Sequence, residues 1–156
     1  MITGENSDPQ KVGKTDFTID LRMWPAIAEA VKVKINAAEN NGDMPKNSVI
    51  ITDNWFPAAH LDYYYAIPNH KKLYILSTPD HQHEFRRINI IRGETKKQCS
   101  AYYMTTSQIY SAPDTSLIAT FEKVEGPEIL AIKTRNKTRV NLFIWKLRDL
   151  KNDYQF

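Results

Sequence analysis

The sequence predicts an α/β protein with a small, doubly wound and partly parallel sheet, an N-terminal helix and a C-terminal antiparallel strand meander. The β-branched run Val49–Thr52 is typical of a short, fully buried strand. A polar corner follows it, and residues 57–66 then carry apolar side chains at helical spacing. Residues 72–76 form a second apolar run. Strand, helix and strand in this order favour a right-handed crossover between parallel neighbours.

The N-terminal part of the chain divides into a polar segment and a helix. Residues 1–16 contain almost no large apolar side chain, so we expect a flexible lead-in or linker there, then a single α/β domain over 17–150 and a C-terminal tail over 151–156. Asp20 is expected to cap the first helix, and Pro25 must then lie in its first turn. The helix is predicted to end at residues 40–42. Its buried stripe consists of Trp24, Ile27, Ala28, Val31, Ile35 and Ala38.

The second half of the chain predicts more strands than helices. Residues 78–89 are polar and charged, so we expect a loop with no more than a helical turn, docked by Ile90 and Ile91. A third strand is predicted over residues 99–105. The remainder predicts three antiparallel strands joined by short turns at 125–127 and 135–137. These strands are expected over 117–124, 128–134 and 139–147.

Composition and charge exclude several classes of protein. The formal net charge is only +3 and the lysines and arginines are scattered, so a nucleic-acid partner is not expected. Cys99 is the only cysteine, which excludes an internal disulfide. No apolar run approaches the roughly 20 residues that a bilayer span needs, so the chain itself is expected to be soluble. No glycine-rich phosphate loop follows a strand, and no cofactor is predicted.

The corner after the first strand is the first candidate ligand site. Ligands of open α/β sheets usually lie beyond the carboxyl ends of the strands, where this chain carries Thr52, Asp53, Asn54 and Trp55. Asp53 or Asn54 can bind a ligand hydroxyl. Either can instead cap the helix that follows, and capping is the simpler interpretation, although one residue can do both.

The stretch after the second strand holds a cluster with metal-ligand chemistry. His81 and His83 point to the same side of an extended segment, and Glu84 follows them. Zinc would need one or two further ligands, from His60 or His70, and nothing in the spacing requires this. A solvated polar loop is the better interpretation, so His81 and His83 are kept as candidate ligand-binding residues and no metal is predicted.

Arg86 and Arg87 complete the list of candidate binding residues. Arginine forks match phosphate oxygens, so this pair could bind a lipid-linked phosphate, although a charged surface is the default interpretation. No catalytic residue is predicted. Asp62 and Glu29 are expected to face water, no close carboxylate pair is apparent, and no serine stands in a nucleophile elbow.

Three stretches together resemble a known family: DLRMWPAIAEAV at 20–31, VIITDNWFPAAHLDYYYAIPNHKKLYIL at 49–76, and the closing strand pair that begins with FEKVEG and ends with LFIWKLRDL. They resemble the C-terminal soluble region of bacterial dolichyl-phosphate-mannose–protein mannosyltransferase-like membrane glycosyltransferases, which include the aminoarabinose-transferase type. The resemblance spans about residues 20–150. Met23 departs from it, because the family often has glycine before the tryptophan.

The resemblance implies a soluble extracytoplasmic (periplasmic) accessory domain of an inner-membrane glycosyltransferase that uses a polyprenyl-phosphate sugar donor. Its partners would be the transmembrane portion of the same polypeptide and a lipid-linked sugar or acceptor glycan. The family's catalytic acidic residues lie in an earlier loop that this sequence does not contain, so the chain alone is not expected to be an enzyme. The alternative is a free-standing α/β domain that binds a sugar or another polar small molecule at residues 52–55.

Overall fold

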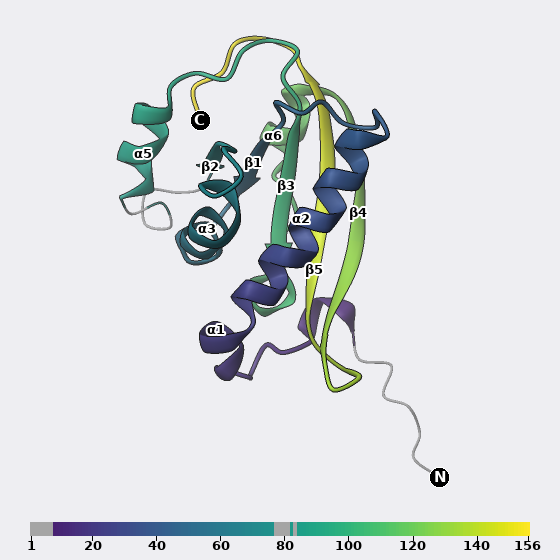
Figure 1. The fold of residues 1–156 in the computed structure, drawn as a ribbon. Coiled ribbons are helices and arrows are strands. Elements are labelled where there is room, and N and C mark those ends of the chain that lie inside the picture. The colour runs from purple at the N-terminus through teal and green to yellow at the C-terminus, as the bar shows by residue number, and fades with distance from the viewer. Residues whose placement is uncertain (1–7, 77–81, 83) are drawn as a thin grey trace.

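A mixed five-stranded sheet organises the computed structural model, which describes residues 8–76, 82 and 84–156 (Figure 1). The strand order is β2-β1-β3-β5-β4. Strands β2, β1 and β3 are parallel, and β5 lies antiparallel between β3 and β4. This confirms the predicted α/β class. The strands are β1 (Val49–Thr52), β2 (Leu73–Ile75), β3 (Ala101–Thr106), β4 (Phe121–Thr134) and β5 (Lys137–Leu150).

The helices lie on both faces and along one edge of this sheet. Helix α2 covers the front of the sheet in Figure 1, α6 lies behind it, and α5 stands beyond β2. The longer helices are α1 (Thr18–Arg22), α2 (Trp24–Asn40), α3 (Trp55–Leu61), α5 (Phe85–Arg92) and α6 (Thr115–Ala119). A π-helical turn, η2 (Asp62–Ala66), continues α3, and two 3-10 turns are η1 (Pro9–Lys11) and η3 (Ser107–Ile109).

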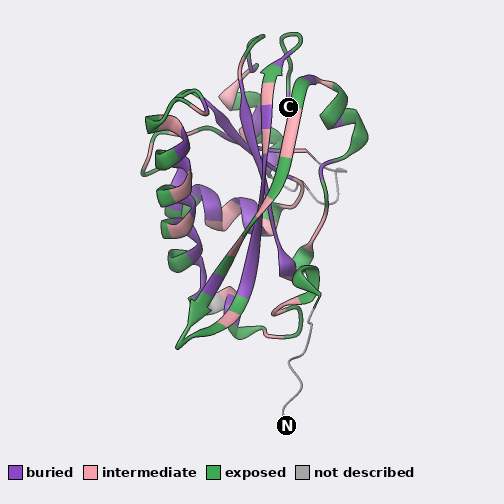
Figure 2. Ribbon diagram, turned by 90° about the vertical axis from the view of Figure 1, so that its right-hand side faces the viewer, coloured by how far each residue is buried: buried purple, intermediate pink, exposed green. Residues whose placement is uncertain are grey.

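The sheet separates two apolar cores. Much of its strand ribbon is purple in Figure 2, the colour of buried residues. Successive side chains of a strand point to opposite faces. Ile50 therefore packs into the core under α2 and α3, whereas Ile51 packs into the core that α6 and the C-terminal residues cover. Tyr102 and Tyr103 of β3 divide between the two cores in the same way.

Most of the predicted elements in the first half are confirmed. The strand Val49–Thr52 is β1, and it pairs with β2 and β3. Helix α2 begins at Trp24, with Pro25 in its first turn, and ends at Asn40. Asn54 caps α3, because its side-chain Oδ1 accepts a hydrogen bond from the backbone N–H of Phe56 at 2.9 Å.

The C-terminal part corrects two predictions. Residues 117–119 belong to α6, whose cap is Asp114, and not to a strand. Residues 125–127 do not form a turn either, because β4 runs through them with a register shift between Glu125 and Glu128. Gly126 has φ +121°, and such a bulge lets the long strand stay paired with β5. The predicted turn at 135–137 is confirmed, since Arg135 and Asn136 both have positive φ between β4 and β5.

The stretch predicted as a loop contains a helix instead. Residues 85–92 form α5, which buries Phe85 and Asn89, four positions apart, against the rest of the domain. Ile90 and Ile91 do not dock this segment, because they are 62% and 81% exposed. Asp20 lies inside α1 and is not a cap.

Part of the expected lead-in contacts the sheet. The Ser107 hydroxyl donates a hydrogen bond to the carbonyl of Val12 at 2.5 Å, and the Asn141 amide donates one to the carbonyl of Pro9 at 2.9 Å. Residues 8–16 thus lie against η3 and β5, and the domain boundary at residue 16 stays a prediction.

Candidate functional site

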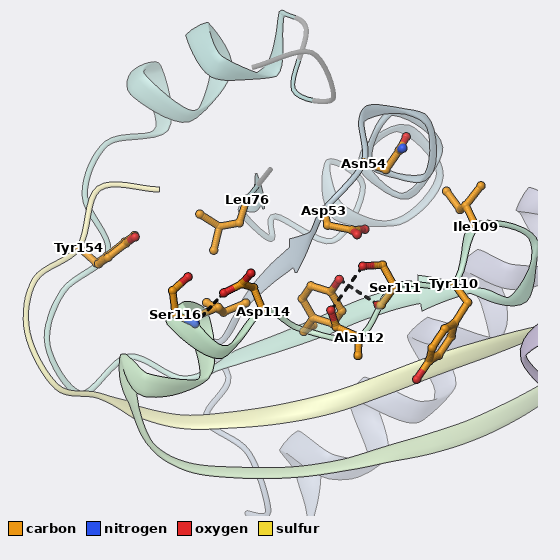
Figure 3. A pocket seen from close by; sticks show the side chains of 12 residues that line it. Asp53, Asn54, Leu76, Ile109, Tyr110, Ser111, Ala112, Asp114, Ser116 and Tyr154 are labelled. Atoms are coloured by element: carbon orange, nitrogen blue, oxygen red, sulfur yellow. Dashed lines mark hydrogen bonds between the residues drawn. The ribbon is translucent and has the colours of Figure 1, made fainter. Parts of the chain in front are cut away.

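A cavity of about 760 Å³ lies at the carboxyl end of the parallel strands β1 and β3 (Figure 3). From β1 the chain turns into α3 and returns as β2 on one side, whereas from β3 it continues towards β4 on the other side. Such a switch point is where open α/β sheets usually bind ligands. The described lining consists of Asp53, Asn54, Leu76, Tyr103, Ile109, Tyr110, Ser111, Ala112, Asp114, Ser116, Leu117 and Tyr154.

Asp53 and Tyr103 form the wall that the sheet provides. Ile51 pairs with Tyr103 across β1 and β3, and both pack in the core on the α6 side. Asp53 stands two positions beyond Ile51, so the alternation of the strand directs it to the same side. The Tyr103 hydroxyl donates a hydrogen bond to the carbonyl of Ser111 at 3.1 Å. Burial and then the adjacent charge of Asp53 raise the pKa of Tyr103, which stays a neutral hydroxyl.

Asp114 brings a second carboxylate to the opposite wall. Its Oδ1 accepts a hydrogen bond from the backbone N–H of Ser116 at 2.7 Å and thereby caps α6. This backbone hydrogen bond lowers the pKa of Asp114, so the carboxylate is ionised at neutral pH. The cap also fixes where the carboxylate stands before any ligand arrives.

Two further tyrosines complete the lining and are held by neighbouring rings. Tyr110 meets Phe143 edge-on, with ring centroids 4.8 Å apart. Tyr154 comes from the C-terminal residues, packs against Phe156 at 4.9 Å and exchanges two backbone hydrogen bonds with Thr95. Because these rings are already positioned, ordering them on a ligand costs little conformational entropy.

The described lining of this cavity is acidic. It contains two aspartates and three tyrosines, and no lysine, arginine or histidine. Ligand hydroxyls would find acceptor oxygens in the two carboxylates, whereas an anion would be repelled by them.

The predicted corner contributes two of its four residues to the cavity. Asp53 and Asn54 line it. Thr52 is fully buried. Because it lies two positions after Ile50 in the strand, its side chain points to the same face of the sheet, towards α2 and α3. Trp55 begins α3, is 41% exposed and packs edge-on against Phe56 at 5.7 Å, outside the described lining.

The second predicted group lies elsewhere. Arg86 and Arg87 are exposed on α5 and do not line the cavity, and the Arg87 guanidinium lies 3.5 Å from the Glu84 carboxylate. His81 and His83 fall outside the residues that the structure describes. Within the described ranges, no group of three or more histidine, cysteine, aspartate or glutamate side chains could hold a metal ion.

Sequence reasoning missed most of the cavity. The sequence alone predicts no binding role for Tyr103 or for residues 110–116. The available signal was the polar run YSAPDTS at 110–116, which begins five residues after the end of the third predicted strand, at the same edge of the sheet as residues 53–55. No sequence pattern predicts that Tyr154 lines the cavity, since its position depends on how the C-terminal residues cross the fold.

The prediction that Asp62 faces water is wrong. It is only 7% exposed, and its Oδ2 accepts a hydrogen bond from the Arg92 guanidinium at 2.7 Å. Arg92 also donates to the carbonyl of Leu73, so this ion pair joins the π-helical turn, α5 and the β2 edge. We assign it a structural role because neither residue lines the cavity.

In comparisons with known proteins, no family model, no curated protein and no solved structure matches this chain. Of the helices in the described residues, none has both the length and the hydropathy that crossing a membrane requires.

Proposed function

We propose that the protein binds a small polar molecule, a sugar or a similar polyol, in the cavity at the carboxyl ends of β1 and β3. The observation that carries the proposal is a cavity of about 760 Å³ at the switch point of the sheet. This volume lies within the range of small-molecule sites, and the lining combines apolar surface with a few convergent polar groups.

The lining chemistry supports a hydroxyl-rich ligand over an anionic one. The carboxylates of Asp53 and Asp114 accept hydrogen bonds from hydroxyls, and the hydroxyls of Ser111 and Ser116 can donate or accept. The tyrosine rings suit the apolar face of a sugar ring. Hydrogen-bonding groups that the fold already holds in place favour specific binding.

The resemblance to membrane glycosyltransferases supplies a context for such a site. We propose on that resemblance that the chain is an extracytoplasmic accessory domain and that the cavity holds part of an acceptor glycan or lipid-linked sugar. The transmembrane portion of the same polypeptide would then be its partner and would carry the catalytic residues. This part is tested by reading the genomic sequence upstream of Met1. In-frame apolar segments of about 20 residues each support it, and an in-frame upstream region without them contradicts it.

Binding itself is tested by thermal unfolding and titration calorimetry with a panel of neutral mono- and disaccharides and linear polyols. A ligand of the native state raises the melting temperature by mass action, by an amount that grows with its concentration. We expect Asp53→Asn and Tyr154→Ala to weaken binding by about tenfold each, as the loss of one good contact does.

The matched controls are Glu122→Gln on β4 and Tyr63→Ala on η2, both exposed and outside the cavity. These two variants should bind as the unmodified protein does. If no member of the panel shifts the melting temperature, or if the control variants lose binding equally, the proposal is wrong.

A further inference from the structure

A second cavity, of about 540 Å³, lies at the opposite end of the parallel strands, beside the amino ends of β1 and β2. Its lining includes Val49 just inside β1, Lys72 just before β2, and the segment 94–99 that leads into β3. None of its lining residues lines the first cavity. We propose that it binds a small oxyanion, such as phosphate or the phosphate group of a monoester.

The charge of the lining favours an anionic ligand. Lys72, Lys96 and Lys97 line this cavity, and Glu94 is the only acidic residue in its described lining. Lys96 lies 3.0 Å from both the Glu94 and Asp153 carboxylates. Neither Lys72 nor Lys97 forms a salt bridge among the described residues, although the charge of Lys97 acts on the nearby Asp153 carboxylate. Lys72 is therefore the ammonium group that the described carboxylates leave unpaired.

Lys72 is held in place without being neutralised. Its Nζ donates one hydrogen bond to the carbonyl of Arg92 at 2.9 Å, so two of its three N–H donors remain. Its charge also acts on the Cys99 thiol, where it opposes the rise in pKa that burial causes, and this places the ammonium near the thiol. An anion in the cavity would therefore meet an ammonium group that is already positioned.

Thr95 gives a second and independent indication. It is 5% exposed and lines the cavity, and its Oγ1 is buried with no hydrogen-bond partner among the described residues. Its backbone N–H and carbonyl are both bonded to Tyr154, so the residue is fixed. A buried hydroxyl without a partner costs free energy, and an oxyanion in the cavity would supply the missing acceptor.

The donor groups of the lining suit an oxyanion. Ammonium groups and a hydroxyl all donate to oxygen, and charge-assisted hydrogen bonds of this kind are stronger than neutral ones. The Asn47 and Gln98 side chains add amide groups that can donate as well.

The test is titration calorimetry of the full chain with inorganic phosphate, sulfate and a phosphate monoester, with chloride at equal ionic strength as the reference. We expect a dissociation constant of about 1 mM or tighter for phosphate. If the monoester binds more tightly than inorganic phosphate, the ligand of this site is a larger molecule that carries a phosphate group. If the two bind equally, the ligand is the free phosphate ion. Either response supports the site.

Two variants make the proposal falsifiable even if one perturbs the fold. Lys72→Gln with Lys97→Gln should weaken phosphate binding by at least about tenfold, since two charge-assisted contacts are lost. Thr95→Val removes the hydroxyl at constant shape, so it should weaken phosphate binding while leaving the melting temperature of the free protein unchanged or raised.

Lys133→Gln, an exposed lysine on β4, is the matched control and should bind phosphate normally. Three outcomes overturn the proposal: no binding of any oxyanion, undiminished binding by the double lysine variant, or an equal loss in the Lys133 control, which would indicate a nonspecific effect of charge.

Discussion

His60 shows how one partly buried side chain couples stability to pH. Its ring stacks on Trp24, with centroids 4.6 Å apart and planes 6° apart, and on Tyr64 at 6.2 Å and 8°. Burial lowers the pKa of His60 below its usual 6.5, and the charge of Asp20 opposes the shift only in part. The fold therefore favours the neutral imidazole.

The sign of the pH effect follows from this shift. With a folded-state pKa below the unfolded value, His60 contributes its full stability above about pH 6.5, and the contribution is lost as the pH falls through the folded-state pKa. We expect the free energy of unfolding to start falling below about pH 6.5, before the carboxylates titrate near pH 4. His60→Phe keeps a stacked ring and should flatten this part of the profile. Urea unfolding at successive pH values measures it, and parallel profiles for the two proteins would contradict the prediction.

Residue-level reasoning from sequence located part of the first cavity. The rule that ligands lie beyond carboxyl ends of strands was enough to select Asp53 and Asn54, because both positions follow directly from the buried run before them. Asp114 and Tyr154 lie about 60 and 100 residues further along the chain. Their arrival at the same cavity depends on strand order, which a local pattern does not encode.

At the scale of elements, α5 replaces a strand at the edge of the sheet. The Asn89 side chain donates to the carbonyl of Ile75 at 2.8 Å and accepts from its backbone N–H at 3.3 Å, as a neighbouring strand would. The Arg92 guanidinium likewise donates a hydrogen bond to the carbonyl of Leu73. The helix escaped prediction because it buries a polar Asn89 and exposes Ile90 and Ile91, which reverses the pattern of an amphipathic helix.

We expect Asn89→Leu to destabilise the protein by about 2 kcal/mol, because the change leaves the buried N–H of Ile75 without a partner and its carbonyl with only the long hydrogen bond from the Gln82 amide at 3.4 Å. Urea unfolding measures the loss, and hydrogen exchange should be faster at the Ile75 amide in particular. Arg86→Gln, an exposed change on the same helix, is the control and should leave both measurements unchanged. A free energy of unfolding within about 0.5 kcal/mol of the unmodified protein for Asn89→Leu would show that the edge does not depend on this side chain.

In the β4–β5 hairpin, a sequence pattern that predicts a turn lies inside a continuous strand. A Gly-Pro pair usually signals a turn, and residues 125–127 were interpreted so. In the structure, pairing with β5 continues on both sides of Gly126, where a Cβ would lie 2.8 Å from the carbonyl oxygen of Ile144. Fourteen residues of β4 thus form one strand, and contacts distant in sequence decide the conformation.

At the scale of the whole molecule, one sheet serves two cores, so the two faces should unfold together. Trp24 belongs to the core under α2 and Trp145 to the core on the α6 side, so each reports on one face. In a Trp55→Phe background, adding Trp24→Phe or Trp145→Phe leaves a single reporter. For each variant, tryptophan fluorescence and circular dichroism should give the same urea midpoint, as a two-state transition requires. Separate midpoints for one face would show that it unfolds independently.

The two outer strands have a consequence for how this protein can meet others. On one side, the outward backbone groups of Leu73 and Ile75 are occupied by the side chains of Arg92 and Asn89. On the other, β4 carries a register shift at Gly126, the proline at 127 and charged residues along its length. Neither margin offers an uninterrupted ladder of free amides on which a foreign chain could add itself. Growth of the sheet into fibres, or recognition of peptides by strand addition, is therefore disfavoured, and encounters are directed to the ends of the strands.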